Sequence, residues 1–202
     1  MLTHKGTLTL TTPRLTLRRL TVDDAPAMYE NWASDEKVTK YLSWDIHESV
    51  EATSELLTKW VTEYKKPKYY HWVIEFNGTI IGTINFHAIS DKDEHCEMGY
   101  CIGSKWWNKG FVTEAAAEII RFAFEELNAN KICALHDTDN IASGRIMQKN
   151  GMKLEGLLRK HKMRKDGTRG DLAYYSILKD EWVINKKLTF IRLYGVYNIT
   201  FR

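Results

Sequence analysis

A short loop around Gly110, running directly into a strongly periodic helix, constrains this fold more than any other segment. Past Thr113, apolar residues recur at the three- and four-residue spacing of one helical face, which predicts a helix reaching Leu127. Amide groups at such a helix start have no carbonyl partners within the helix and carry partial positive charge. The loop therefore predicts a binding site for the phosphate groups of a cofactor.

The segment before this loop is rich in β signals. Asn77-Gly78 stands between two β-branched and aromatic runs, Tyr69–Phe76 and Thr79–Phe86, and this dipeptide is the strongest short signal for a hairpin. A third strand, His95–Ile102, leads into the loop. We expect these three strands to form an antiparallel meander.

The remaining elements follow from the same patterns. Helices are expected from Asp23-Asp24 to about Ala33 and over Glu48–Tyr64, and strands over Thr7–Thr11 and Leu15–Leu20. After the long helix we expect the strand Asn130–His136, the helix Asn140–Asn150 closed by Gly151, and a hairpin of Leu154–Lys162 and Leu172–Leu178 around Asp166-Gly167. This order indicates an α+β, or mixed α/β, fold and not a regular βαβ alternation.

Composition bounds the class of protein. A length of 202 residues suits one domain, and a net charge of +3 is too weak to indicate nucleic acid by itself. Three cysteines in no disulfide or metal pattern, with no signal peptide and no apolar run of about 20 residues, predict reduced thiols, a cytoplasmic location and no membrane span. We expect no metal site: Asp137-Thr138-Asp139-Asn140 begins like a calcium loop, but the required glycine is replaced by Ala142.

Seven short motifs lie in order between Thr12 and Gly156. They are Thr12-Pro13-Arg14-Leu15-Thr16-Leu17-Arg18, Gly82-Thr83-Ile84, Glu97-Met98-Gly99-Tyr100, Trp107-Asn108-Lys109-Gly110-Phe111-Val112-Thr113-Glu114-Ala115, Asn140-Ile141-Ala142-Ser143, Asn150-Gly151-Met152 and Leu154-Glu155-Gly156. Their order and spacing resemble the GNAT acetyltransferases, and within them the RimJ/RimL group that acetylates the N-termini of ribosomal proteins. The resemblance extends from about Pro13 to Trp182.

The resemblance implies a GNAT fold: a mostly antiparallel central sheet, splayed in the middle and flanked by helices. It implies one acetyltransferase domain over residues 1–182, and leaves the β-prone tail 183–202 unassigned. It also implies acetyl-CoA as cosubstrate. The implied cofactor-binding residues are Tyr100, Cys101 and Ile102 beside the acetyl group, Asn108, Lys109, Gly110, Phe111, Val112 and Thr113 around the pyrophosphate, and Asn140 and Ser143 near the pantetheine arm.

Two departures from the family pattern stand out. Trp107 and Val112 replace the usual first and last residues of the cofactor loop, while the central Gly110 is kept. Because the family holds pyrophosphate with backbone amides, we interpret Trp107 as altered packing. Many GNATs place a proton-donating tyrosine seven residues after the asparagine, and here that position is Met147. The general acid for the leaving thiolate is therefore unassigned.

Glu97 is the candidate catalytic base. Attack on a thioester needs an uncharged amine, and a carboxylate near the site, acting directly or through water, would help to remove the proton. Its strand ends at the cofactor loop, and the resemblance places the acetyl group there. The alternative is a solvated strand glutamate, and His87 is a weaker candidate base. We interpret Cys101 as a small buried residue, because no partner that would activate its thiol is visible.

A basic run, Arg159 to Lys165 with Arg169, surrounds the predicted hairpin tip. It is either a solvated turn or a surface that attracts cofactor phosphates, an acidic substrate or ribosomal RNA. The expected function is transfer of an acetyl group to a primary amine, with a protein N-terminus favoured and a ribosomal protein as one acceptor. Small amines, a non-catalytic acyl-CoA-binding module and a homodimer remain open.

Overall fold

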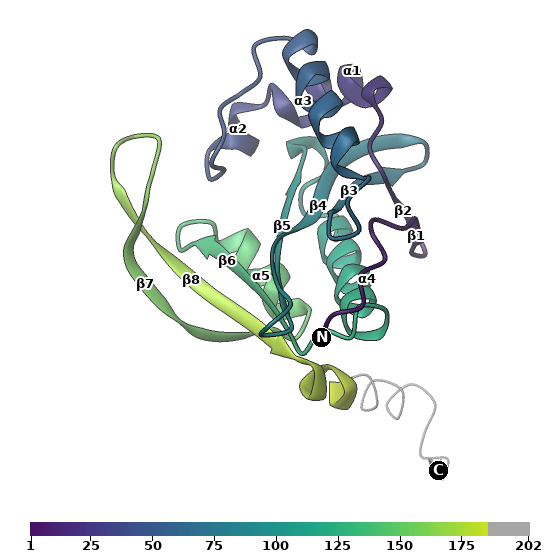
Figure 1. The fold of residues 1–202 in the computed structure, drawn as a ribbon. Helices are drawn as coiled ribbons and strands as arrows, with labels where there is room; N and C mark the ends of the chain where they lie inside the picture. The colour runs from purple at the N-terminus through teal and green to yellow at the C-terminus, as the bar shows by residue number, and fades with distance from the viewer. Residues whose placement is uncertain (186–202) are drawn as a thin grey trace.

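The computed structural model describes residues 1–185, which form one eight-stranded sheet flanked by helices on both faces (Figure 1). The predicted tail, Leu188–Arg202, lies outside the described residues. Strand order across the sheet is β1-β2-β3-β4-β5-β6-β8-β7. The strands are β1 (Leu10–Thr11), β2 (Leu15–Arg18), β3 (Tyr70–Phe76), β4 (Thr79–Ser90), β5 (His95–Ile102), β6 (Lys131–Asp137), β7 (Lys153–Met163) and β8 (Arg169–Leu178).

The helices fall into two layers. One layer precedes β3 and holds α1 (Ala25–Met28), α2 (Glu36–Thr39) and α3 (Val50–Glu63); the other holds α4 (Phe111–Glu125) and α5 (Ile141–Lys149). Residues 179–185 are helical and run past the expected boundary at 182. No helix among residues 1–185 has the length and hydropathy to cross a bilayer.

The sheet opens at its centre, between β5 and β6. These two strands are parallel, whereas every other neighbouring pair is antiparallel, and they pair only through His95↔Lys131, Cys96↔Ile132 and Glu97↔Cys133. Beyond Glu97 and Cys133, β5 continues to Ile102 and β6 to Asp137 without pairing with each other. The predicted mostly antiparallel, centrally splayed sheet is confirmed. We call the opening the fork.

Alternation along β5 assigns its two faces, because successive side chains of a strand point to opposite sides. Cys96 and Met98 are buried in the large core that includes α4. Cys101 instead packs against the smaller core formed with α1 and α3. Glu97 and Gly99 share the parity of Cys101, so Glu97 lies on the sheet face opposite α4.

Most predicted elements are confirmed within a few residues. The turn Asn77-Gly78 has φ of 49° and 75°, the left-handed pair that a two-residue hairpin requires. Ser49 caps α3 by accepting from the amide of Ala52. Asn140 caps α5, and Gly151 follows that helix with φ of 77°.

Two predictions needed correction. Only Leu10–Thr11 of the expected strand Thr7–Thr11 pairs with β2. The expected helix ending near Ala33 is divided into a 3₁₀ turn, α1 and a π-helical segment, Tyr29–Ala33. The wider π turn accompanies full burial of Trp32. There the Asn31 amide also donates to the carbonyl of Ile80, 2.8 Å away.

His71, buried on β3, predicts a specific acid sensitivity. Its Nδ1 lies 3.1 Å from the Tyr69 hydroxyl, its Nε2 has no hydrogen-bond partner within residues 1–185, and burial lowers its pKa to about 4. The unfolded chain binds this proton more tightly, near pH 6.5. The free energy of unfolding is therefore unaffected above about pH 6.5 and falls by about 1.4 kcal/mol per pH unit as the pH drops toward 4. Denaturant unfolding of wild type and His71→Gln from pH 7 to 4 should show a shallower decline in the variant. Parallel declines would contradict this assignment.

Candidate functional site

The loop between β5 and α4 presents a row of free amides. Gly110 begins α4 with φ of 78°, and Asn108 also has a left-handed φ of 61°. The first helical bond is donated by Glu114 to the carbonyl of Gly110, at 3.0 Å. Among the described residues, no acceptor faces the amides of Asn108 through Thr113. Such amides at a helix start form an anion-binding cradle.

The N-terminal segment holds this loop in place from outside. Arg14 donates to Glu114 at 2.6 Å and to the carbonyl of Lys109 at 3.1 Å, and its guanidinium lies 4.6 Å from the Phe111 ring centroid. Thr12 donates to Glu114 as well. Although burial opposes it, these donors keep the pKa of Glu114 below its usual value. The carboxylate is thus ionised and occupied by protein groups.

Trp107, the departure from the family loop, has a structural role. Its indole Nε1 donates to the carbonyl of Ile102 at 2.9 Å, which satisfies the last peptide group of β5. Lys109 turns its ammonium back to the carbonyl of Lys105 and stays exposed. The tryptophan therefore fixes the backbone at the end of β5, which fits its interpretation as a packing residue.

Peptide groups on the open edge of β5 face the fork. Backbone groups of alternate residues in a strand point to the same edge. The carbonyl of Cys96 accepts from the Cys133 thiol and that of Ile102 from the Trp107 indole, so both are directed away from β4. Tyr100 has the same parity. Because β6 no longer pairs there, the peptide group of Tyr100 meets no strand partner across the fork.

Tyr100 also bridges the fork with its side chain. Its hydroxyl lies 2.9 Å from the Ser143 hydroxyl and donates to the Ser143 carbonyl at 3.1 Å. Burial raises the pKa of Tyr100 to about 12, so it stays protonated at neutral pH. Asn140 accepts from the amide of Ser143 at 3.3 Å. Met147 is buried in the core, so the phenol at this fork comes from β5 and not from α5.

Glu97 forms a pair with His87 on the opposite face. A β-bulge between Phe86 and Ala88 turns His87 toward β5, where its Nε2 lies 2.8 Å from a Glu97 carboxylate oxygen. Gly99 makes room for the ring, since a Cβ there would lie 3.0 Å from His87 Nδ1. Beside it, the buried Oδ1 of Asn85 has no hydrogen-bond partner within residues 1–185. A bulge of this kind leaves no signal in the sequence.

The cysteines and the acidic stretch have structural surroundings. Cys101 contacts the Thr83 hydroxyl at 3.3 Å, and burial raises the pKa of its thiol, which disfavours a nucleophilic thiolate. Asp137 and Asp139 both pair with Arg164, at 2.7 and 2.8 Å. Among residues 1–185, no cluster of three histidine, cysteine, aspartate or glutamate side chains could hold a metal ion.

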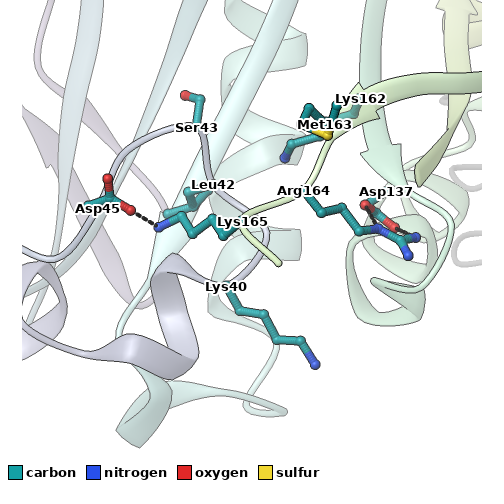
Figure 2. Close-up of a pocket in the computed structure, with 9 residues that line it drawn as sticks. All are labelled: Lys40, Leu42, Ser43, Asp45, Asp137, Lys162, Met163, Arg164 and Lys165. Carbon is teal, nitrogen blue, oxygen red and sulfur yellow. Dashed lines mark hydrogen bonds and ion pairs between the residues drawn. The ribbon is translucent and has the colours of Figure 1, made fainter. Parts of the chain in front are cut away.

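A cavity of about 310 Å³ lies between the segment after α2 and the β7–β8 hairpin (Figure 2). We call it the basic cavity. Lys162 donates to the carbonyl of Tyr41 and Lys165 to that of Trp44, so the hairpin closes on this segment. The basic run predicted from sequence thus forms part of a concave wall. Its lining residues are Lys40, Leu42, Ser43, Asp45, Asp137, Lys162, Met163, Arg164 and Lys165.

Comparison with known proteins agrees with this fold. The acetyltransferase (GNAT) domain family matches residues 14–153. YoaA of Bacillus subtilis (strain 168), described as an uncharacterized N-acetyltransferase, is 37% identical over 172 residues, which cover 84% of this chain and 96% of the relative. A solved GNAT-family acetyltransferase from Bacillus anthracis is 27% identical with a TM-score of 0.74, covering 86% of this chain and 99% of that one.

A second relative has a stated acceptor. The ribosomal protein uS5-alanine N-acetyltransferase of Escherichia coli (strain K12) is 30% identical over 104 residues, covering 51% of this chain and 53% of that protein.

Gly110→Ala should weaken binding of acetyl-CoA. An alanine at φ of 78° is strained, and relief of the strain would rotate the neighbouring amides out of alignment. We expect the Kd to rise about tenfold, which is the effect of about 1.4 kcal/mol. Calorimetric titration measures it.

Gly78→Ala is the matched control for this substitution. Its φ of 75° imposes the same strain at a hairpin tip, with open space around it. It should lower stability to a similar extent and leave the Kd unchanged. Equal affinity in all three proteins would refute a role for this loop in acetyl-CoA binding.

Proposed function

This chain belongs to the GNAT family of acetyl-CoA-dependent N-acetyltransferases, and from that premise we propose that it acetylates the N-terminal amine of a protein at the Glu97 fork. The observation that carries the proposal is the end of β5–β6 pairing at Glu97, with an ionisable pair on one face and free amides at the open end. An extended cofactor arm would take the place of the missing strand partner along the unpaired part of β5.

The two ends of the fork suit the two ends of acetyl-CoA. The free amides of residues 108–113 would hold the pyrophosphate, and the peptide group of Tyr100 would orient and polarise the thioester carbonyl. Glu97 and Ile102 are five residues apart, roughly 17 Å along an extended strand. The pantetheine arm would cross that distance between β5 and β6.

The acceptor amine would bind beside Glu97, His87 and Asn85. The Glu97 carboxylate accepts the ammonium proton, directly or through water, while His87 holds the carboxylate in position at 2.8 Å. The unpartnered Asn85 Oδ1 offers an acceptor for a remaining N–H group. Holding amine and thioester together contributes a large part of the rate gain by itself.

Tyr100 and Ser143 would meet the leaving sulfur on the other face. With a pKa of about 12, the Tyr100 phenol is a poor proton source for a thiolate, whose conjugate thiol has a pKa of about 8.5. It can still donate a hydrogen bond that stabilises the developing charge. The proton itself would reach sulfur from solvent.

The acceptor class rests on relatives and on shape. The Escherichia coli relative acts, by its name, on an alanine of ribosomal protein uS5, which supports a ribosomal-protein N-terminus here. Small amines form the second candidate class, because Glu97, His87 and Asn85 alone could bind a compact amine. A panel of peptide N-termini and small amines, assayed for thiol release from acetyl-CoA, separates the two.

Glu97→Gln should lower kcat/KM about a hundredfold at pH 7, because general base catalysis contributes about 10² to 10⁴. For an α-amine of pKa about 7.7–8.0 the deficit should shrink at pH 9, where the amine deprotonates itself, whereas a lysine side chain of pKa about 10.4 would show little rescue. The pH profile of the variant therefore reports the acceptor class as well as the role of Glu97.

Glu55→Gln, on the exposed surface of α3, removes one carboxylate away from the fork and should retain full activity. Acetyl-CoA binding by Glu97→Gln should match wild type. If wild type binds acetyl-CoA but turns over no amine in the panel, the protein is a binding module and the proposal is wrong.

A further inference from the structure

We infer that the acceptor is an acidic peptide N-terminus, whose carboxylates enter the basic cavity while its amine lies at Glu97. This inference rests on the proposed function, because it names the acceptor class for the same transfer. Three features carry it: the side of the sheet on which the cavity opens, the charge of its wall, and its distance from the fork.

The basic cavity lies on the amine side of the sheet. In β6, Cys133 is the partner of Glu97, and Leu135 and Asp137 share the parity of Cys133. His136 points the other way, onto α5, where its ring lies against Gly144. Asp137 therefore lies on the face of Glu97, opposite α4 and its anion-binding loop. Cofactor phosphates held at the start of α4 would not reach this wall.

Four cationic side chains and two carboxylates line the cavity. Arg164 is turned onto Asp137 and also pairs with Asp139, and Lys165 is turned onto Asp45 (Figure 2). The ammonium groups of Lys40 and Lys162 make no ion pair with any carboxylate of the described residues. Ion pairing thus occupies Arg164 and Lys165 and leaves Lys40 and Lys162 as the cations of this wall without a carboxylate partner in the described part of the chain.

Lys162 is the more constrained of these two cations. Its ammonium donates to the carbonyl of Tyr41 at 2.5 Å, and burial lowers its pKa, with nearby Asp137 opposing that shift and Lys165 and Arg164 adding to it. Lys40 lies over the ring of Tyr41, 5.2 Å from its centroid, and is exposed. A carboxylate between them would relieve the repulsion among the cations and replace water lost by Lys162.

The distance suits a peptide. Cys133, opposite Glu97, and Asp137 are four residues apart, about 13 Å along β6. An extended peptide advances about 3.3 Å per residue, so an amine at Glu97 would bring the third to fifth residues to the cavity. The rim formed by the 40–46 segment and the hairpin tip would contact those side chains.

The test compares two peptides that differ only in charge. One carries glutamate at positions 3, 4 and 5, and the other glutamine at the same positions. We expect wild type to show about fivefold higher kcat/KM for the acidic peptide, through KM, which is the scale of two partly exposed ion pairs. Lys40→Gln combined with Lys162→Gln should bring this ratio close to one, and the preference in wild type should weaken at high salt.

Two further variants make the result specific. Lys40→Arg combined with Lys162→Arg keeps both positive charges and should preserve the ratio. Loss of the ratio in the double glutamine variant alone is then an effect of charge and not of misfolding. Lys92→Gln, in the exposed turn between β4 and β5 at the far end of β5, should leave both the ratio and the activity unchanged.

The outcomes separate this inference from the proposed function. Turnover of both peptides at equal kcat/KM, or a preference that survives in the double glutamine variant, overturns the inference and leaves the acetyltransfer mechanism intact. Turnover of small acidic amines but neither peptide overturns it in favour of a small-molecule acceptor. No thiol release with any amine overturns both.

Discussion

The fold depends on the point where β5 and β6 stop pairing. Three residue pairs join the strands, ending at Glu97↔Cys133, and beyond them the sheet divides while its outer strands stay paired. Ending a ladder in a protein interior leaves peptide groups without partners, which is costly unless other groups satisfy them. Trp107 satisfies the last carbonyl of β5, and Tyr100 joins α5 through its hydroxyl. An extended ligand can satisfy what is left.

Packing keeps the two halves of the sheet apart without letting them separate. The long helix α4 buries residues from most of its length in the large core, which spans both halves. On the opposite face α1 and α3 cover the β3–β4 side, around Val73 and Ile80, and reach β5 at Cys101. The uncovered part of that face carries Glu97 and His87, and the β7–β8 hairpin curves beside it (Figure 1). Unequal coverage of the two faces thus separates the cofactor side from the amine side.

Sequence patterns predicted the elements that local chemistry determines. The stripe of α4, the Asn77-Gly78 turn and the Asn140 cap are decided by neighbours within a few residues, and all three are present. The π turn at Tyr29–Ala33 accompanies burial of Trp32, and β1 is limited to the two residues that pair with β2. No local pattern contains either feature.

The site divides in the same way. Glu97 and the Gly110 loop could be selected from sequence, because a strand leading into a glycine loop and helix is a local signal. The bulge that brings His87 to Glu97 could not, since its position is set by the register of two strands. The basic cavity is closed by a hydrogen bond between Lys162 and Tyr41, which are 121 residues apart in the chain. Such contacts follow only from the complete topology.

The clasp of Thr12 and Arg14 on Glu114 has a consequence for dynamics. It connects residues about 100 positions apart, so the order of the Gly110 loop depends on the segment around Thr12 and Arg14 as well as on α4. Proteins open in cooperative units smaller than the whole, and β1, which has two residue pairs with β2, is a small part of this sheet. Detachment of β1 would therefore increase the mobility of the amides of residues 108–113 while α4 stayed folded. Amide exchange in the loop would then follow the local opening of the segment around Thr12 and Arg14 and not the global unfolding of the domain.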